Sequence, residues 1–368
     1  MIRKGTNVSD SVIAKWIFIG VVMLIIQIML GGITRLTGSG LSITEWDVIT
    51  GTIPPLNEKQ WLEEFHKYQL TPQYRLLNFE FTLSDFKSIF FWEWFHRFWG
   101  RLIGFAFAVP FIFFLSQGWF RNWMIRPLLI LFLFGALQGL VGWIMVQSGL
   151  TGDAVYVNPL KLAMHFILAS MLISYAWWFG LQLSIKKESF VADAGLKKFT
   201  WLLIILLFAQ MVYGALMAGY KAATAAPTWP DINGSIFPAY VFNRPEGAVS
   251  MIQNPIVIHF IHRSFAYLLT LLTIAWTIRA LRTKATAAFK KIRLLPAVLV
   301  LIQLSLCIAT VLSSTMIRPA KWNRFEWMAQ LHQLVAIVFL LSLITVLFFL
   351  QRKQKANSAP QLESPLIS

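Results

Sequence analysis

The chain has 368 residues, of which 57% are hydrophobic and only 13% are charged. Because soluble domains usually have about a quarter of their residues charged, this composition excludes an ordinary water-soluble protein. The formal net charge of +16 would suit a nucleic-acid-binding protein, but the basic residues gather in short segments between apolar ones. This distribution argues against nucleic acid as a partner.

Apolar segments long enough to cross a membrane, which takes about 18 or more residues, recur eight times along the chain. The sequence therefore predicts an all-α polytopic membrane protein with eight transmembrane helices. The second segment is the least regular, because Arg101 lies inside it. In chain order the predicted segments are 14–33, 95–115, 127–147, 162–185, 199–220, 256–278, 294–314 and 327–350.

The charged residues predict how these helices are oriented. With the N-terminus in the cytoplasm, more than half of the Lys and Arg residues lie in the cytoplasmic pieces, which are 1–15, 116–126, 186–198, 279–293 and 351–368. The long outer loop 34–89 has more acidic than basic residues. Both termini are therefore predicted to be cytoplasmic, and the basic pieces are predicted to attract anionic membrane lipid. The first segment lacks a small-residue cleavage site and follows no transit peptide, which favours the bacterial plasma (inner) membrane.

The chain contains an internal repeat of four helices. EWFHR at 93–97 matches HFIHR at 259–263, and LVGWIMVQSGL at 140–150 is compared with CIATVLSSTMI at 307–317. Four helices per half give both halves the same orientation, as in a parallel repeat. The fold class is therefore two tandem pseudo-symmetric four-helix bundles. The predicted units are an N-terminal bundle at 1–185, a C-terminal bundle at 186–355 and a disordered tail at 356–368.

The outer loop 34–89 is long enough to expect a function of its own. Asn57 is placed to cap a short helix that carries Trp61, Leu62, Phe65 and Tyr68. This spacing gives the helix an apolar face, so we expect it to lie on the bundle or in the membrane interface.

Four histidines lie near the outer ends of the even-numbered predicted helices, and the helical rise puts them at similar depth. His96 precedes His165 by 69 residues, and His262 precedes His332 by 70, so each half has one pair. A single histidine in a membrane helix is often only a polar residue with a hydrogen bond inside the bundle. Four histidines in two matching pairs instead predict ligation of a metal or a heme.

Heme fits these pairs better than zinc does. Zinc normally takes a third or fourth ligand from Cys, Asp or Glu, whereas each half has few carboxylates near its pair. The chain has a single cysteine, Cys307, so no intrachain disulfide is possible and a thiolate metal site is not expected. Two imidazoles on facing helices suit the two axial positions of heme iron. The 31 Phe and 16 Trp residues provide the apolar slot that a porphyrin needs.

For the charged residues beside the histidine pairs, the sequence allows two interpretations each. Arg97 and Arg263 follow two of the histidines and either reach heme propionates or extend to lipid headgroups. Glu93 either ends its helix in water or places a carboxylate over the edge of one heme, where it would handle a proton or a cation. His259 stands at the matching position of the second half and is expected to be a neighbour of the ligands, not a ligand. His66, in the outer loop, is expected at the surface.

At these motifs the chain resembles the heme A synthase family. The resemblance covers about residues 12–350 and rests on GGITRLTGSGLSITEW, GTIPP, EWFHR with GRLIG, HFIHR and the two later histidine contexts. Some bacterial members have cysteine pairs in outer loops, which this chain lacks, so it looks like the cysteine-free branch with a long first outer loop. The resemblance implies oxidation of the C8 methyl group of heme O to the formyl group of heme A, which serves terminal oxidases.

The resemblance also implies roles for particular residues. A substrate heme is expected in the N-terminal half and a heme b in the C-terminal half, and Glu93 matches an important glutamate of the family. The residues expected at the substrate heme are His96, His165 and Arg97. The residues expected at heme b are His262, His332 and Arg263.

Several points stay open at this stage. Two axial histidines leave no free iron position, so either one ligand moves away in turnover or water supplies the formyl oxygen. The expected partners are heme O, heme O synthase, an electron donor of unknown kind and membrane lipid, and a homo-oligomer is left open. The alternative function is a two-heme b-type membrane electron carrier, and the plainest one is a transporter with buried histidines.

Overall fold

The computed structural model describes residues 7–45, 50–243, 247–317 and 322–351. The predicted disordered tail at 356–368 lies outside these residues. Within them, eight helices are long and apolar enough to cross a membrane, which confirms the predicted all-α polytopic fold. The spanning helices are α1 (Asn7–Leu36), α4 (Leu83–Ser116), α5 (Asn122–Gln147), α6 (Pro159–Ser184), α7 (Ala194–Gly219), α11 (Pro255–Arg282), α13 (Leu295–Ser313) and α14 (Arg324–Phe349).

Shorter helices connect the spanning ones at both ends of the molecule. They are α2 (Glu58–Gln69), α3 (Pro72–Leu77), α8 (Ala222–Ala225), α9 (Ala239–Phe242), α10 (Ser250–Gln253) and α12 (Ala287–Ile292). Single 3-10 turns occur at Thr50–Thr52, Lys187–Ser189, Gly247–Val249 and Ser314–Met316.

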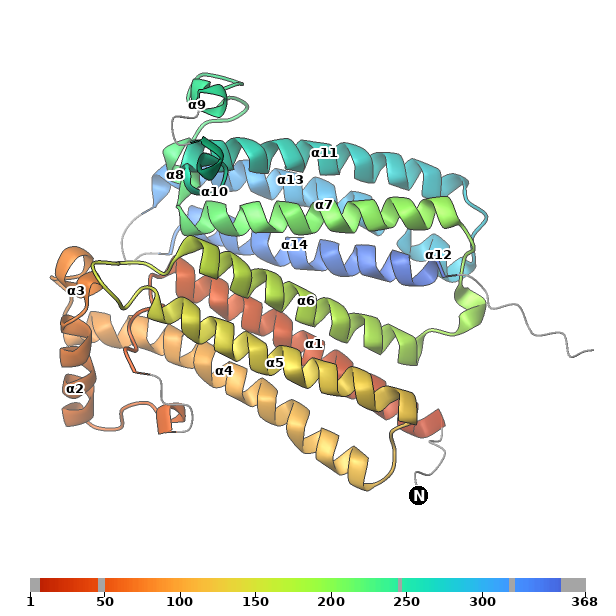
Figure 1. Ribbon diagram of the computed structural model, residues 1–368, viewed down its shortest axis with the longest axis horizontal. Helices are drawn as coiled ribbons and strands as arrows, with labels where there is room; N and C mark the ends of the chain where they lie inside the picture. Colours follow the sequence, from red (N-terminus) through yellow and green to blue (C-terminus); the bar gives the residue numbers. More distant parts are fainter. Residues whose placement is uncertain (1–6, 46–49, 244–246, 318–321, 352–368) are drawn as a thin grey trace, which may run out of the picture.

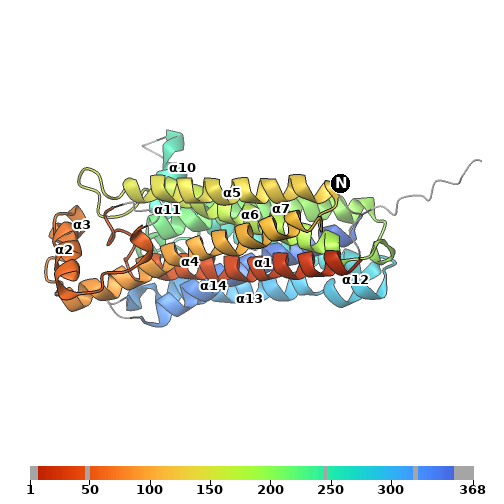
Figure 2. The same ribbon diagram turned by 90° about the horizontal axis from the view of Figure 1, so that it is seen from below.

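The spanning helices form two neighbouring sets, α1 with α4, α5 and α6, and α7 with α11, α13 and α14 (Figures 1 and 2). The sets meet where α1 and α6 of the first contact α7 and α14 of the second. The largest cluster of buried apolar side chains draws on both sets, for example on Ile173 of α6, Leu203 of α7 and Leu340 of α14. One hydrophobic core therefore joins the two predicted halves.

Helix α4 starts well before the predicted position, at Leu83 instead of residue 95. Thr82 and Asp85 form a capping box at its start, and Phe86 and Phe90 of its first turns pack among aromatic residues of the outer loop. With 34 residues the helix is about 51 Å long, which exceeds the roughly 30 Å hydrocarbon core. The expectation that His96 lies near the outer end of its helix is therefore wrong.

The outer loop folds over one end of the bundle, as predicted for its helix. Asn57 caps α2 and accepts a hydrogen bond from the main-chain nitrogen of Gln60 at 3.0 Å. Phe65 and Tyr68 are buried, but Leu62 is 50% exposed and does not belong to the packed face. Burial raises the pKa of Tyr68 to about 12, so its phenol stays neutral at physiological pH. Helices α2 and α3 thus form a cap across the outer end of α4 (Figure 1).

The two ends of the bundle differ in what they carry. Helix α1 starts at one end of the bundle, where α12 with Lys290 and Lys291 also lies, and α2, α3, α8 and α10 lie at the other end (Figure 1). The start of the chain and the segment with α12 were predicted to lie on one side of the membrane and the long loop on the other, and the structure separates them in this way. The direction of the bundle in the membrane stays a prediction.

Candidate functional site: two histidine pairs in one cavity

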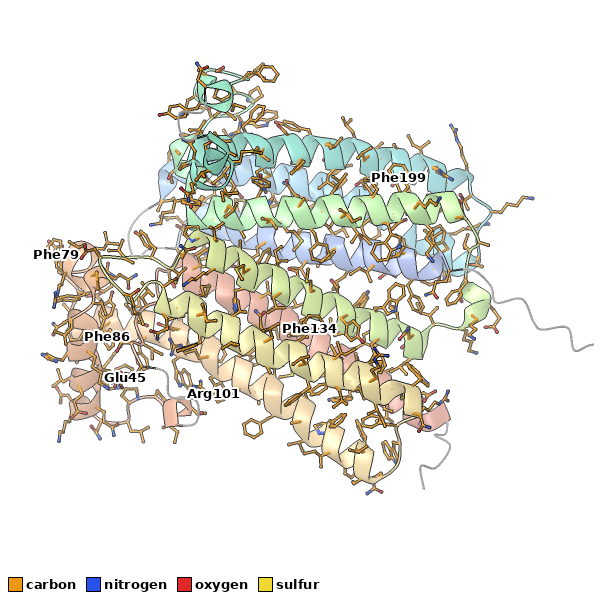
Figure 3. The ribbon with its side chains drawn as sticks, in the orientation of Figure 1. Glu45, Phe79, Phe86, Arg101, Phe134 and Phe199 are labelled. Carbon is orange, nitrogen blue, oxygen red and sulfur yellow. The ribbon has the colours of Figure 1, made fainter. Side chains whose placement is uncertain are left out.

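A cavity of about 1990 Å³ lies between the spanning helices, and all eight of them contribute to its wall. Ligand pockets commonly measure roughly 300–1,000 Å³, so this cavity has room for more than one ligand of ordinary size. Apolar side chains, among them Phe134 and Phe199, fill much of the space between the helices (Figure 3). The four histidines of the predicted pairs all line the cavity.

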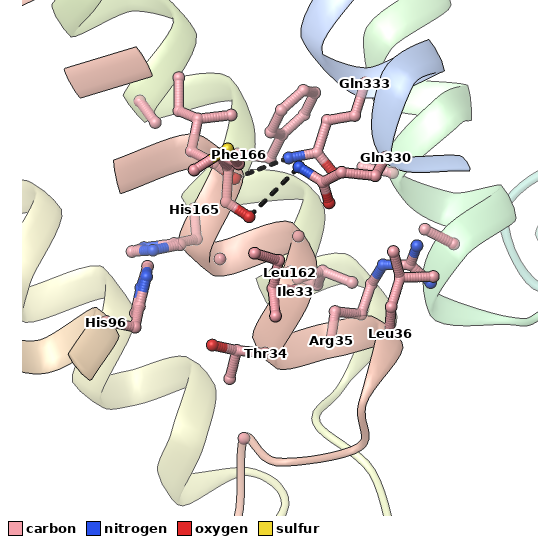
Figure 4. Close-up of a pocket in the computed structure, with 18 of the residues that line it drawn as sticks. Ile33, Thr34, Arg35, Leu36, His96, Leu162, His165, Phe166, Gln330 and Gln333 are labelled. Carbon is pink, nitrogen blue, oxygen red and sulfur yellow. Dashed lines mark hydrogen bonds between the residues drawn. The ribbon is translucent and has the colours of Figure 1, made fainter. Parts of the chain in front are cut away.

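The first pair consists of His96 on α4 and His165 on α6, whose imidazole rings face each other (Figure 4). Each ring lies against a glycine of an odd-numbered helix. A Cβ atom added to Gly31 would lie 3.1 Å from Cε1 of His96, and one added to Gly142 would lie 2.9 Å from Cε1 of His165. The rings therefore occupy space that only a missing side chain leaves free.

The second pair consists of His262 on α11 and His332 on α14, with ring centroids 6.3 Å apart and planes at 71°. Metal–imidazole bonds of about 2.0–2.1 Å on opposite sides of one ion put the two nitrogens roughly 4 Å apart. The ligand atoms of His262, His332 and Cys307 all lie within 4.8 Å of one another. The pair is thus spaced for two axial ligands of one iron, and Cys307, which the sequence left without a role, lies beside it.

Glu93 is not at a helix end in water, which corrects the plainer of its two readings. The residue is 2% exposed because α4 continues past it toward the outer loop. Its Oε2 accepts hydrogen bonds from the main-chain nitrogen and the hydroxyl of Ser42, both at 2.7 Å, and from the nitrogen of Ile43 at 2.9 Å. Its Oε1 accepts from Arg97 Nη2 at 2.6 Å. Glu93 also lines the cavity, so it joins the outer loop to the wall beside His96.

The two arginines bind the outer loops of their own halves. Arg97 donates to the carbonyl oxygens of Ile43 at 3.1 Å and Glu45 at 3.2 Å, besides its ion pair with Glu93. Arg97 also lines the cavity. A contact between its guanidinium and a heme propionate stays a prediction.

Arg263 is buried and makes the corresponding contacts in the second half. It donates to the carbonyl oxygens of Thr228 at 2.5 Å and Asp231 at 2.7 Å. Its Nε donates to Nε2 of His259 at 3.0 Å. These contacts direct the guanidinium toward the loop after α7, and a role at a propionate stays a prediction here too.

The remaining two histidines are placed as follows. His259 is completely buried and lies one helical turn before Arg263, for which it is a hydrogen-bond acceptor. His66, on α2, is exposed, as expected. Neither lies in the two facing pairs.

Sequence reasoning missed a pattern on four of the spanning helices, which are α1, α5, α7 and α13. In each of them a glutamine contacts a histidine of the next spanning helix, and a small residue follows four positions later. The four sets are Gln27 and Gly31, Gln138 and Gly142, Gln210 and Gly214, and Gln303 and Cys307. These contacts make Gln138 and Gln303 equivalent positions of the two halves. The alignment of the segments that start at 140 and 307 therefore differs from the structural one by two residues. A search for Gln-x-x-x-Gly would have found three of the four.

Eight spanning helices around a cavity lined by two histidine pairs define a polytopic membrane protein with a large internal site. A profile of the COX15-CtaA family, described as cytochrome oxidase assembly protein, matches residues 14–344. The chain is 40% identical over 352 residues to a heme A synthase of Cereibacter sphaeroides, covering 92% of this chain and 87% of that protein.

Two further relatives have the same name. A heme A synthase of Methylorubrum populi is 38% identical over 355 residues, covering 95% of this chain and 89% of that protein. One of Bradyrhizobium diazoefficiens is 39% identical over 353 residues, covering 95% and 94%. The chain therefore belongs to the COX15-CtaA family, the heme A synthase family that its motifs predicted. These matches do not favour the alternative of a b-type electron carrier.

Proposed function

We propose that this chain is a heme A synthase that oxidises the C8 methyl group of heme O to the formyl group of heme A. Its family and the names of its relatives support this function. The structural observation that carries the proposal is the single cavity lined by two facing histidine pairs. A cavity of that size with paired imidazoles suits two porphyrins, one to be changed and one to stay.

We further propose a division of labour between the halves at 1–185 and 186–355. His96 and His165 flank the substrate heme, with Glu93 and Arg97 at its outer edge. His262 and His332 hold a resident heme b, which supplies electron transfer when bound. Two observations support this assignment: the 6.3 Å ring separation in the second pair and Glu93, a carboxylate at the position where the second half has His259.

The reaction sets clear requirements for the residues of the first half. Turning a methyl group into a formyl group with water as the oxygen source releases four protons and four electrons. The enzyme therefore has to admit water in a controlled way and lead protons out of an apolar cavity. Glu93 lines that cavity and is hydrogen-bonded to the outer loop. It is thus placed to pass a proton from the cavity toward the outer surface.

The setting of the protein follows from the same proposal. We place it in the bacterial inner membrane with both termini in the cytoplasm, supported by the basic segments and by the position of α12 at the same end of the bundle as the start of α1. Its expected partners are heme O synthase, which supplies the substrate, an electron-transfer protein and anionic lipid. A homo-oligomer is compatible with this arrangement.

The test is chromatography of hemes extracted from cells that express heme O synthase with or without this chain. We expect heme O alone without the chain and heme A when the chain is present. The matched control is the His96→Ala variant, which removes one flanking histidine and should leave heme O unconverted. Cells with the intact, membrane-inserted chain that contain heme O but no heme A would contradict the proposal.

A further inference from the structure

The amide groups of the four glutamines that face the histidines differ between the two halves. In the first half, Gln27 Nε2 lies 3.3 Å from Nε2 of His96 and also donates to the main-chain carbonyl of His96 at 3.2 Å. Gln138 Nε2 lies 3.2 Å from both ring nitrogens of His165 and donates to the carbonyl of that residue at 3.1 Å. Each of these amides is therefore fixed with its nitrogen toward the histidine.

The second half has the ring contact without the carbonyl contact. Gln210 Nε2 lies 3.4 Å from Nε2 of His262, and Gln303 Nε2 lies 3.0 Å from Nδ1 of His332. In the part of the chain that the structure describes, neither amide donates to a histidine carbonyl. A half-turn about the last side-chain bond would exchange nitrogen and oxygen without moving the rest of the side chain. Nothing in these contacts prevents that turn in the second half.

The buried atoms around the pairs show what such a turn would achieve. The amide oxygens of all four glutamines are buried without a hydrogen-bond partner, and so are Nδ1 of His96 and Nδ1 of His262. A histidine that ligates a metal through one ring nitrogen nearly always donates the N–H of the other to an acceptor. The turned amides would offer that acceptor, and the acceptor would hold each ring in place.

The first half cannot use the same arrangement without losing a bond. If the amide of Gln27 turned, its oxygen would face the carbonyl oxygen of His96, and two acceptors would meet. While it keeps its orientation, the amide N–H points at the ring. A neutral imidazole has one lone-pair nitrogen, so that N–H competes with iron for the same lone pair. The same reasoning applies to Gln138 and His165.

We propose that these four glutamines set how firmly each histidine pair holds heme iron. Gln210 and Gln303 act as acceptors and make His262 and His332 lasting ligands, whereas Gln27 and Gln138 act as donors and make His96 and His165 exchangeable ones. All four are positioning residues. The inference rests on the proposed function, and it explains how a substrate heme with two axial histidines can still be released or lose one ligand.

The small residues four positions after the glutamines support this reading. Without a side chain at Gly31, Gly142 and Gly214, each ring lies close against the helix that carries its glutamine. In the fourth set Cys307 takes this position beside His332. A competing acceptor is the main-chain carbonyl of the glutamine itself, which faces the rings of His96, His262 and His332 alike. A side-chain exchange leaves this acceptor unchanged. Mutation of the side chain therefore separates the two possibilities.

The test compares the full-length protein, purified in detergent, with Gln303→Leu, Gln210→Leu, Gln27→Leu and Gln138→Leu. Loss of heme b is followed after adding excess apomyoglobin as a heme scavenger, and the reduction potential of heme b is measured by optical titration. The second-half variants should release heme b about 10–100-fold faster, the usual effect of removing such a partner. Their potential should rise, because the lost acceptor favoured the oxidised iron, by about 59 mV for each tenfold difference in affinity between the two redox states.

The first-half variants should behave in the opposite way. In protein loaded with heme O by co-expression with heme O synthase, Gln27→Leu and Gln138→Leu should release heme O no faster than the unmodified chain, because a competitor of iron is gone. Gln303→Glu keeps an acceptor and should retain heme b, which guards against a loss caused by misfolding. The control is Gln182→Leu, an exposed glutamine of α6 that is not among the residues lining the cavity; it should change neither release nor potential.

Two results would overturn the inference. One is unchanged release and potential of heme b in both Gln210→Leu and Gln303→Leu. The other is faster loss of heme O in the first-half variants than in the unmodified chain. If the unmodified protein instead holds no heme that depends on His262, the proposed function fails, and this outcome is distinct from a failure of the glutamine assignment.

Discussion

Helices α4 and α11 each hold an outer loop through an arginine, but the group that faces this arginine differs. In both halves the arginine directly after a facing histidine donates to carbonyl oxygens of the preceding outer loop, Arg97 to Ile43 and Arg263 to Asp231. The residue four positions before each arginine is a carboxylate in the first half and an imidazole in the second. In both halves the arginine therefore fixes an outer loop, and the halves differ in the charge of the group that faces the arginine.

The difference shows where the protein needs an ionisable group. Glu93 compensates the charge of Arg97 and also binds two main-chain nitrogens, so the first loop is fixed to the cavity wall by a carboxylate. His259 offers Arg263 only a ring nitrogen. The first half thus has a carboxylate next to its histidine pair, whereas in the second half the cationic Arg263 donates to a ring nitrogen of His259.

The largest effect on this comparison should come from Glu93→Gln. The amide places its NH₂ group either against the nitrogens of Ser42 and Ile43 or against Arg97, so donors face donors on one side whichever way it turns. We expect a loss of about 1–3 kcal/mol of stability and a fall in heme A yield of roughly 10²-fold. The yield is measured per mole of folded protein that holds heme b.

Glu63→Gln is the control for that exchange. Glu63 lies in α2 with a side chain that is 56% exposed and a 4.0 Å ion pair with Lys59, so its neutralisation should leave yield and stability as they are. An unchanged heme A yield in folded Glu93→Gln would remove the reason to call the first half the reactive one.

A smaller effect is expected from Gly142→Ala in the first half. The added Cβ would lie 2.9 Å from Cε1 of His165, so the ring has to move, at a cost of about 1–3 kcal/mol. Heme A formation should decrease while heme b stays bound. Gly139→Ala, on the same helix with nothing within 4 Å of the new atom, should match the unmodified chain. Equal yields from the two variants would show that the position of His165 does not matter.

The smallest effect should follow from His259→Phe in the second half. The exchange removes the acceptor of Arg263 Nε, but the guanidinium keeps the carbonyls of Thr228 and Asp231. We expect a loss of about 1 kcal/mol, seen as a slightly lower unfolding temperature, with unchanged heme b absorbance. A full loss of heme b in a folded variant would mean that His259 contributes more to the second site than a loop contact.

Most of the fold could be predicted from the hydrophobicity of the segments and from the residues that cap helices. The eight spans follow from apolar length alone, and Asn57 was recognisable as a cap because its side chain suits that position. The start of α4 was missed because its outer turns contain polar residues and are stabilised by Phe86 and Phe90 packing under α2. No local pattern reports such a contact with a distant loop.

Those parts of the candidate site that consist of unusual single residues could be predicted from the sequence. The histidine pairs stand out because an imidazole is rare in a membrane helix. The burial of Glu93 was not predictable, since it depends on Ser42 and Ile43 turning back over α4. The glutamines were missed because each is one polar residue in a long apolar helix, and because the two halves were compared two residues out of register.

The most direct test of the account is the heme b content of purified variants from cells that lack heme O synthase, where heme b occupies the resident site without turnover. His262→Ala and His332→Ala should each lower heme affinity at least about 100-fold, since even partners of a ligand contribute 10–100-fold, and the protein should be purified nearly free of heme. His96→Ala and His165→Ala should keep one heme b per chain. Heme b retained by the second-pair variants, or lost from the first-pair variants, with helix content intact by circular dichroism, would contradict the assignment of the two halves.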